Sequence, residues 1–360
     1  MKHEELRAFA ARLKTLIEAG SALPEEACFN SLALDLFAFQ FRHNPALASL
    51  CRFRGITPEK VDSWEQIPAV PTSAFKEMEM TCLSPEERQT VFHSSGTTAQ
   101  KPSRHFHNAE TLAAYEASLA PWFARHFRVS EARARPAILS LTPPPDQAPN
   151  SSLVHMFKTL IRQFGSDSSG FVGEVDGNQN WRISPDLLRQ AAEAAQARQE
   201  PVLLLGTAFS FVHLLDLPSL ALPAGSAVLE TGGYKGKSRE IEKPELHRLI
   251  SRHTAIPGSR IVSEYGMSEL SSQAYDKAAD GAGERVFHFP PWARAQVISA
   301  ETGREVPEGG EGLLRVFDLA NIGSALAIQT EDLAVRRGPG FQLLGRSPSS
   351  EPRGCSLMPA

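Results

Sequence analysis

The chain has 360 residues, and its 42% hydrophobic and 22% charged residues are typical of globular proteins. A net charge of −4 argues against a general basic surface for nucleic acid, and the four cysteines lack the spacing of a zinc site or a disulfide framework. No signal-peptide block opens the chain, and the most apolar stretch, residues 201–217, is too polar for a comfortable membrane span. A cytoplasmic protein without a membrane span is therefore expected.

Residues 1–90 are expected to form a helical N-terminal part. Apolar residues at helical spacing predict a helix over residues 5–18, and Pro24 suits the first turn of a second helix that ends near Phe41. After residue 92, predicted helices over 109–127, 151–164 and 185–198 alternate with apolar strands over 137–141, 201–205, 226–230 and 260–264. This alternation predicts an α/β sheet covered by helices.

The pattern changes again near the end of the chain. Strands are predicted over 293–299, 312–317, 332–336 and 341–344, with glycine-containing turns at 301–303 and 338–340. We therefore expect residues 91–346 to form an α/β core with a small β-rich end. The tail, residues 347–360, contains Pro348, Pro352 and Pro359, which do not favour regular structure.

Three short segments carry polar residues suited to chemistry, and the first is a loop rich in hydroxyl groups and glycine. Its members are Ser94, Ser95, Gly96, Thr97 and Thr98, and Lys101 follows. Backbone N–H groups and hydroxyls in such a loop can surround phosphate oxygens. The spacing is not that of a GxxxxGK[ST] loop, and an ordinary polar loop is the alternative.

The second segment follows the strand predicted over 260–264. It consists of Tyr265, Gly266, Met267, Ser268 and Glu269. The aromatic ring can line a base or acyl pocket, and the carboxylate can hold Mg²⁺. The alternative is an ordinary turn with Tyr265 and Met267 in the core.

The third segment contains Asp332, at the predicted start of a strand, and Arg346 after the last predicted strand. The carboxylate can accept hydrogen bonds from ribose hydroxyls, and the guanidinium can contact sugar or phosphate. A solvated acid and a surface arginine are the alternatives.

In order and spacing, these segments resemble the adenylate-forming superfamily of acyl-CoA synthetases, peptide-synthetase adenylation domains and luciferases, over roughly residues 70 to 358. The resemblance implies an ATP-binding site in which the first segment binds pyrophosphate and the second lines adenine. Glu269 would then bind Mg²⁺, Asp332 the ribose, and Arg346 would stand at the interdomain hinge. Gly232 and Gly233 fall where the family has a glycine-containing adenine segment.

Residues 71–76 (Pro-Thr-Ser-Ala-Phe-Lys), residues 230–237 and above all residues 353–357 (Arg-Gly-Cys-Ser-Leu) look like the LuxE family of acyl-protein synthetases. This resemblance implies activation of a fatty acid with ATP, acyl transfer to Cys355, and delivery to a partner reductase subunit. A cation such as Arg353 would favour the Cys355 thiolate.

The sequence departs from the superfamily in three places. Ala99 stands where glycine is common, Ser268 replaces a threonine, and only fourteen residues follow Arg346, so the superfamily's lid domain with its catalytic lysine is expected to be absent. Lys101, Lys235 and Lys237 are the candidates to replace that lysine.

Two other functions remain open. One is an acyl- or aryl-CoA ligase of the phenylacetate-CoA ligase type, and the other is a nucleotide- or acyl-binding subunit without catalysis. His105 and His107 have a spacing that could bind a metal, but no third ligand is evident, so a structural or surface role is expected. Cys28 and Cys51 are expected to be small core residues.

Overall fold

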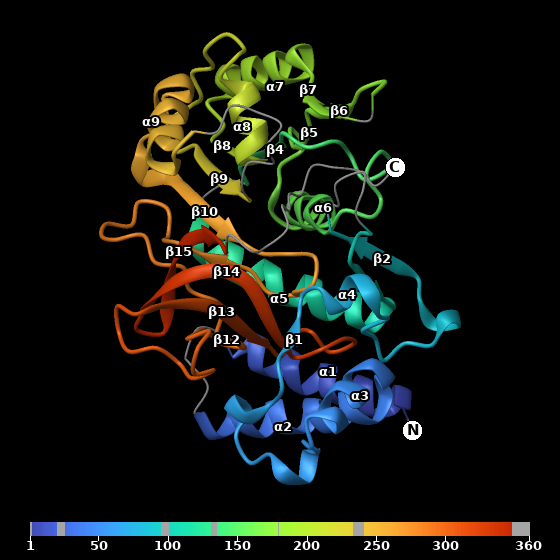
Figure 1. The fold of residues 1–360 in the computed structure, drawn as a ribbon. Helices are drawn as coiled ribbons and strands as arrows, with labels where there is room; N and C mark the ends of the chain where they lie inside the picture. Colours follow the sequence, from blue (N-terminus) through green and yellow to red (C-terminus); the bar gives the residue numbers. More distant parts are fainter. Residues whose placement is uncertain are drawn as a thin grey trace.

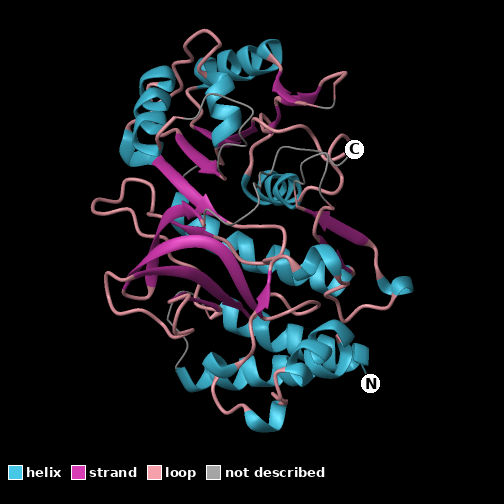
Figure 2. Cartoon of the chain, viewed as in Figure 1, coloured by secondary structure: helices cyan, strands magenta, loops and turns pink. Residues whose placement is uncertain are grey.

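Two large β-sheets organise the described part of this chain, and helices cover them (Figure 1). The structure is a computed structural model that describes residues 2–19, 26–94, 101–130, 135–178, 180–232 and 241–347. Figure 2 shows strands covered by helices, with helices alone in the lowest part of the view, and both kinds of element agree with the predicted α/β class.

The first sheet has six strands in the order β11-β10-β9-β8-β4-β5. They are β4 (Ala137–Ser140), β5 (Gly170–Phe171), β8 (Val202–Thr207), β9 (Ala227–Thr231), β10 (Ile261–Tyr265) and β11 (Ala274–Tyr275). All pairs are parallel except β10 with β11. Apolar runs predicted β4, β8, β9 and β10 at nearly the same residues, because both faces of a parallel sheet are buried.

Helices cover both faces of this sheet. On one face lie α5 (Ala109–Phe127) and α6 (Ser152–Phe164), and on the other lie α7 (Pro185–Arg198), α8 (Ala208–Leu214) and α9 (Lys243–Thr254). Side chains alternate between the two cores, so that Ile138 packs with α5 and α6 while Leu139 packs with α7 and α8. The three helices predicted after residue 92 are confirmed.

The second sheet has five strands, in the order β1-β14-β13-β12 with β15 also paired to β14. They are β1 (Val70–Pro71), β12 (Ala293–Ile298), β13 (Glu311–Asp318), β14 (Ala327–Arg337) and β15 (Gly340–Arg346). Strand β14 begins earlier than predicted, because its first residues pair with β13 and with the distant β1. Asp332 therefore lies within a strand, and the prediction that it starts one is wrong.

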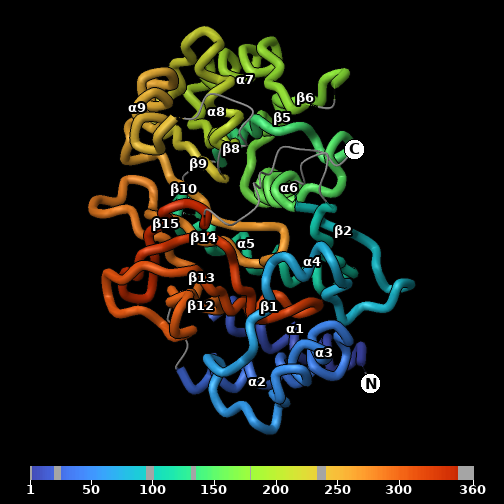
Figure 3. The backbone as a smooth tube through the Cα atoms, in the orientation of Figure 1, coloured from blue at the N-terminus to red at the C-terminus, as the bar shows by residue number. Residues whose placement is uncertain are grey.

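The N-terminal helices pack against the second sheet rather than against the first. They are α1 (Lys2–Glu18), α2 (Glu26–His43) and α3 (Pro45–Phe53). Their apolar faces share one core with β12, β13 and β14, and Trp64 lies 4.7 Å from Phe317 between ring centroids. Figure 3 agrees with this, since the blue N-terminal helices lie beside the orange and red strands β12 to β14.

Short elements connect these layers. They are α4 (Ala74–Glu77), β2 (Thr90–His93), β3 (Arg104–His107), β6 (Gly173–Val175), β7 (Trp181–Ile183) and 3-10 turns at Pro58–Lys60, Trp64–Gln66, Pro85–Glu87 and Gly258–Arg260. Strands β2 and β3 form an antiparallel hairpin. Among the described residues, no helix has the length and apolar character that a membrane crossing needs.

Candidate active site

The second and third sequence segments meet at the carboxyl end of β10. Tyr265 is the last residue of β10, and its hydroxyl donates to Asp332 Oδ2 at 2.7 Å. Asp332 lies opposite Arg346 in the β14–β15 ladder, with Arg346 Nε 3.4 Å from Asp332 Oδ1. In Figure 1 the arrow of β10 accordingly ends beside β14 and β15. Residues far apart in the sequence thus form one polar group between the two sheets.

Tyr265 has an apolar side as well as a polar one. The residue is 7% exposed, and its ring centroid lies 5.4 Å from that of Phe341 and 6.2 Å from that of Phe287. The ring is thus part of the core, as the alternative reading expected, while its hydroxyl reaches Asp332. Tyrosine can pack in the core and still bind Asp332, because only the hydroxyl end of its side chain is polar.

The ends of the hydroxyl-rich loop are joined by the β2–β3 hairpin. The Ser94 N–H donates to Ser103 O at 3.3 Å, and the Ser103 N–H donates to Ser94 Oγ at 2.9 Å. Lys101 is exposed. Ser95, Gly96, Thr97 and Thr98 lie outside the described residues, so the structure places only the base of this loop.

Ser268 connects the second segment to this hairpin. Its Oγ donates to the carbonyl oxygen of His93 at 3.0 Å, and its own carbonyl oxygen lies 2.8 Å from His105 Nδ1. His93 immediately precedes Ser94, the first residue of the loop. All three sequence segments therefore converge on one region of the molecule.

Glu269 follows Ser268 and is buried, with 1% of its surface exposed. The Asn321 amide donates to the Glu269 carbonyl oxygen at 2.9 Å. The chain beyond it is held by Asp318, whose Oδ2 accepts from the N–H groups of Ser271 at 2.9 Å and Ser272 at 2.7 Å. Sequence reasoning missed Asp318 and Asn321, although two polar residues among apolar ones at the end of a predicted strand are a usable signal.

A second buried acid, Glu264, lies at the same end of the parallel sheet. The Thr231 hydroxyl donates to its carboxyl group. Burial, together with the negative charge of Glu230, raises the pKa of Glu264 to about 7. A Cβ at Gly266 would collide with this carboxyl group, so only glycine fits there without displacing it.

Gly232 follows Thr231 at the end of β9. Its φ of +74° lies in the left-handed region, and a Cβ there would have no atom within 4 Å. Backbone conformation, rather than crowding, accounts for glycine at this position. Gly233, Lys235 and Lys237, together with Arg353 and Cys355, lie outside the described residues.

Glu230, on β9, binds side chains of α9 and β10 near this end of the parallel sheet. Its Oε2 lies 3.3 Å from Lys243 Nζ, 3.2 Å from His247 Nε2 and 3.1 Å from Ser263 Oγ. Burial alone would raise the pKa of Glu230, but Lys243 and His247 lower it to about 2. The network ties α9 to β9 and β10, and no local pattern in the sequence predicts these contacts.

His105 and His107 are both buried on the hairpin, as a structural role predicts. Burial lowers the pKa of His105 to about 4 and that of His107 well below its usual value. Within the described ranges, no group of three or more His, Cys, Asp or Glu side chains could hold a metal ion.

Three of the four cysteines are placed by the structure. Cys51 and Cys82 are buried, and burial raises their pKa values to about 11 and about 12. Cys28 is exposed on α2, next to the buried Phe29, so the prediction that it is a core residue is wrong. Phe29, Leu32 and Leu36 occupy the buried apolar face of the helix, and Cys28 lies one residue off that face.

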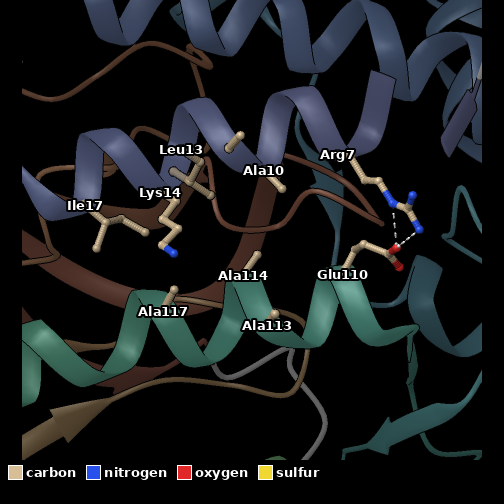
Figure 4. A pocket seen from close by; sticks show the side chains of 10 residues that line it. Arg7, Ala10, Leu13, Lys14, Ile17, Glu110, Ala113, Ala114 and Ala117 are labelled. Carbon is tan, nitrogen blue, oxygen red and sulfur yellow. Dashed lines mark hydrogen bonds and ion pairs between the residues drawn. The ribbon is translucent and has the colours of Figure 1, made fainter. Parts of the chain in front are cut away.

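A separate hollow of about 230 Å³ lies between α1 and α5 (Figure 4). Small apolar side chains such as Ala10, Ala114 and Ala117 line it, and Arg7 Nε donates to Glu110 Oε1 at 3.0 Å at one end. None of the motif residues lines this hollow, so it is not part of the polar site.

The sequence of this chain is similar to one protein family and to characterised proteins. The sequence matches the family described as "Acyl-protein synthetase, LuxE" over residues 19–359, which extends the expected resemblance toward the N-terminus. It is similar to a long-chain-fatty-acid–luciferin-component ligase of Vibrio harveyi, with 19% identity over 342 residues, 89% of this chain and 84% of the relative.

Two solved structures have a similar fold. One is 2-hydroxyisobutyryl-CoA ligase in an open conformation with 2-HIB-AMP and CoA, with a TM-score of 0.62, 13% identity, and coverage of 90% of this chain and 76% of that one. The other is ATP-bound MatB from Rhodopseudomonas palustris, with a TM-score of 0.51, 16% identity, and coverage of 95% and 72%. The predicted fold class, α/β of the adenylate-forming type, is confirmed.

Proposed function

This chain belongs to the LuxE family of acyl-protein synthetases, and we propose that it activates a long-chain fatty acid and then carries the acyl group on Cys355. The family makes it an AMP-forming acid ligase, which activates a carboxylic acid as an acyl-adenylate. The long chain of the acid is suggested by the Vibrio harveyi relative, whose name specifies such a substrate.

The observation that carries the proposal is the meeting of three sequence segments at Ser268 and Tyr265. Ser268 contacts the base of the hydroxyl-rich loop, and Tyr265 contacts Asp332. An extended nucleotide fits such an arrangement, because its phosphates, base and ribose need different partners. We assign the phosphates to Ser94, Ser95, Gly96, Thr97 and Thr98, the adenine to Gly232, Gly233 and residues 265–268, and the ribose to Asp332 with Arg346 nearby.

Mg²⁺ fits the donor chemistry of Glu269. Magnesium usually binds one or two carboxylates together with substrate phosphates, and Glu269 is a buried carboxylate beside the proposed phosphate site. When bound, the ion would neutralise phosphate charge and help pyrophosphate to leave.

In the first step, a carboxylate oxygen of the fatty acid forms a bond to the α-phosphorus of ATP. The bond from that phosphorus to the β-phosphate oxygen breaks, and pyrophosphate leaves with the electron pair. Thr97 and Thr98 donate hydrogen bonds to the departing phosphates, and Lys101 supplies a positive charge near them. Catalysis at this step is mainly the positioning and charge neutralisation that these residues provide.

In the second step, the Cys355 thiolate attacks the acyl carbonyl carbon. The thioester bond forms as the bond to the AMP oxygen breaks, and the thiol proton has already passed to solvent. Arg353 favours the thiolate. Cys51 and Cys82 are poor acceptors, because burial keeps their thiols protonated. We propose that the thioester then passes to a partner reductase.

Half-reactions test this assignment, with Cys28→Ser as the matched control because Cys28 is an exposed thiol. Cys355→Ser should still form acyl-adenylate but should retain no label from a radioactive fatty acid. In the wild type and in Cys28→Ser, the label should survive denaturation and be released by neutral hydroxylamine. Deletion of residues 351–360 should reproduce Cys355→Ser. A hydroxylamine-labile label that persists on Cys355→Ser and disappears from Cys28→Ser would move the acceptor to Cys28.

A second candidate is an acyl-CoA ligase, favoured by the similarity of 90% of this chain to a CoA ligase fold. In that case Cys355→Ser with CoA should form acyl-CoA at the wild-type rate. The acyl-protein synthetase proposal expects no CoA-dependent product.

A further inference from the structure

His105 lies on β3 in a fully packed position at the back of the proposed site. It is 2% exposed, and its ring lies 6.1 Å from that of Phe75 on α4. Its Nδ1 is 2.8 Å from the carbonyl oxygen of Ser268. Since a carbonyl oxygen can only accept, Nδ1 carries the proton and donates it in this bond. The hydrogen bond therefore fixes both the tautomer and the orientation of the ring.

Ser268 is bound to both strands of the same hairpin. Its carbonyl oxygen accepts from His105 on β3, and its hydroxyl donates to His93 O on β2 at 3.0 Å. His93 and Arg104 are paired where the two strands lead into the hydroxyl-rich loop. The residue next to Glu269 is thus held at two points by the hairpin that supports the loop.

We propose that His105 is a positioning residue, which holds the segment of Glu269 against the β2–β3 hairpin by fastening Ser268 to it. The inference rests on the proposed function, in which Glu269 binds Mg²⁺ and the loop binds the phosphates of ATP. Magnesium demands a nearly ideal octahedral geometry, so a small displacement of its carboxylate ligand weakens binding. Residues that do not touch the metal but hold its ligands in place commonly affect metal affinity, and their replacement lowers it.

His107 provides a matched control on the same face of β3. Its ring centroid lies 4.3 Å from that of His105, and it is equally buried. Its Nδ1, however, lies 3.2 Å from the Thr111 hydroxyl of α5. A substitution there perturbs the same hairpin core but leaves the bond to Ser268 in place.

The test compares His105→Leu, which removes the donor, with His105→Asn, which keeps an N–H group near the position of Nδ1. Two quantities are measured. One is the Mg²⁺ concentration for half-maximal acid-dependent ATP–pyrophosphate exchange, and the other is the rise in unfolding temperature caused by MgATP. His105→Leu should need about ten times more Mg²⁺ and should lose most of the MgATP stabilisation, the effect usual for partners behind a metal ligand. His105→Asn should recover most of both, and His107→Leu should keep the Mg²⁺ requirement within about twofold.

An unchanged Mg²⁺ requirement in His105→Leu would overturn the inference and leave the proposed function intact. Absence of exchange in the wild-type protein would instead remove the proposed function. If His105→Leu does not fold, wild-type protein with ¹⁵N-labelled histidine decides the question. Mg²⁺ with ATP should then shift the ring resonances of His105 and not those of His107, and unshifted His105 resonances would contradict the inference.

Discussion

Glu264 is an acid inside the protein at the end of a parallel strand, with Thr231, Glu230 and Lys243 around it. Its pKa of about 7 in the folded state exceeds the ordinary value of 4.5. The folded state therefore binds this proton more tightly than the unfolded state. The resulting stability is complete below the ordinary pKa and is lost as the pH rises through about 7.

Replacement of Glu264 by glutamine should isolate this effect. The amide stays neutral and its oxygen can still accept from Thr231. The free energy of unfolding, measured in urea, should be similar for wild type and Glu264→Gln near pH 5. At pH 8 the variant should have gained stability relative to the wild type, by an amount on the order of 1 to 3 kcal/mol for a shift of this size. A difference that stays constant with pH would contradict the raised pKa.

Asp332 and Glu331 are neighbouring carboxylates that both contact Arg346, at 3.4 Å and 2.7 Å. Only Asp332 also accepts from Tyr265. If Asp332 binds the ribose, Asp332→Asn should weaken ATP binding about tenfold or more, the cost of losing a hydrogen bond to a charged group. Glu331→Gln should leave it nearly unchanged. Calorimetric titration with ATP measures the affinity of each variant. Equal affinities of Asp332→Asn and Glu331→Gln for ATP would count against the ribose assignment.

For individual residues, the sequence indicated some members of the candidate site and not others. Tyr265, Ser268 and Asp332 stand in segments whose order resembles a known family. Glu264 stands beside Tyr265 of the second segment, but its burial could not be predicted, because a glutamate at the end of an apolar strand is as compatible with solvent as with burial. Its environment depends on Thr231 and Gly266, and only the fold brings these together with it.

Helix α5 shows how well a whole element can be predicted from local sequence. The predicted helix over residues 109–127 has the observed bounds. Its start is fixed by Asn108, whose side chain accepts from Thr111 N–H at 3.0 Å, while the Thr111 hydroxyl accepts from Asn108 N–H at 3.0 Å. Such reciprocal capping satisfies N–H groups that the helix itself cannot bond.

Asn108→Ala should therefore lower the free energy of unfolding by about 1 kcal/mol, the usual effect of a lost N-cap. Asn178→Ala is the control, since Asn178 lies in an exposed turn where its backbone N–H bonds to Asp176. Urea denaturation compares the three proteins. Equal stabilities for Asn108→Ala and wild type would show that the cap does not hold the helix.

Strand β14 shows where local prediction stops. Its first residues, which include Ile328 and Gln329, pair with Val70 and Pro71 of β1. No periodicity within residues 327–331 indicates that partner, because the partner lies near the other end of the sequence. The local pattern therefore predicts a start at Asp332, whereas the strand begins at Ala327.

Over the whole molecule, the N-terminal helices and the second sheet share one core, and this sheet holds the site from one side through Asp332 and Arg346. The parallel sheet holds it from the other, through Thr231 and Tyr265. The α/β class followed from the alternation of helices and strands. The packing of α1 to α3 on β12 to β14 did not, because amphipathic helices identify a buried face without identifying what covers it.

The central claim is that this arrangement activates a carboxylic acid as an adenylate. Exchange of labelled pyrophosphate into ATP, measured over a panel of carboxylic acids, tests it most directly. We expect exchange that requires Mg²⁺ and an acid, is fastest with long-chain fatty acids, and persists in Cys355→Ser. In the Thr97→Ala/Thr98→Ala variant the rate of acid-dependent pyrophosphate exchange should fall about 10²-fold, the usual effect of removing such hydrogen-bond donors. Protein that binds ATP yet exchanges no pyrophosphate with any acid in the panel would contradict the account.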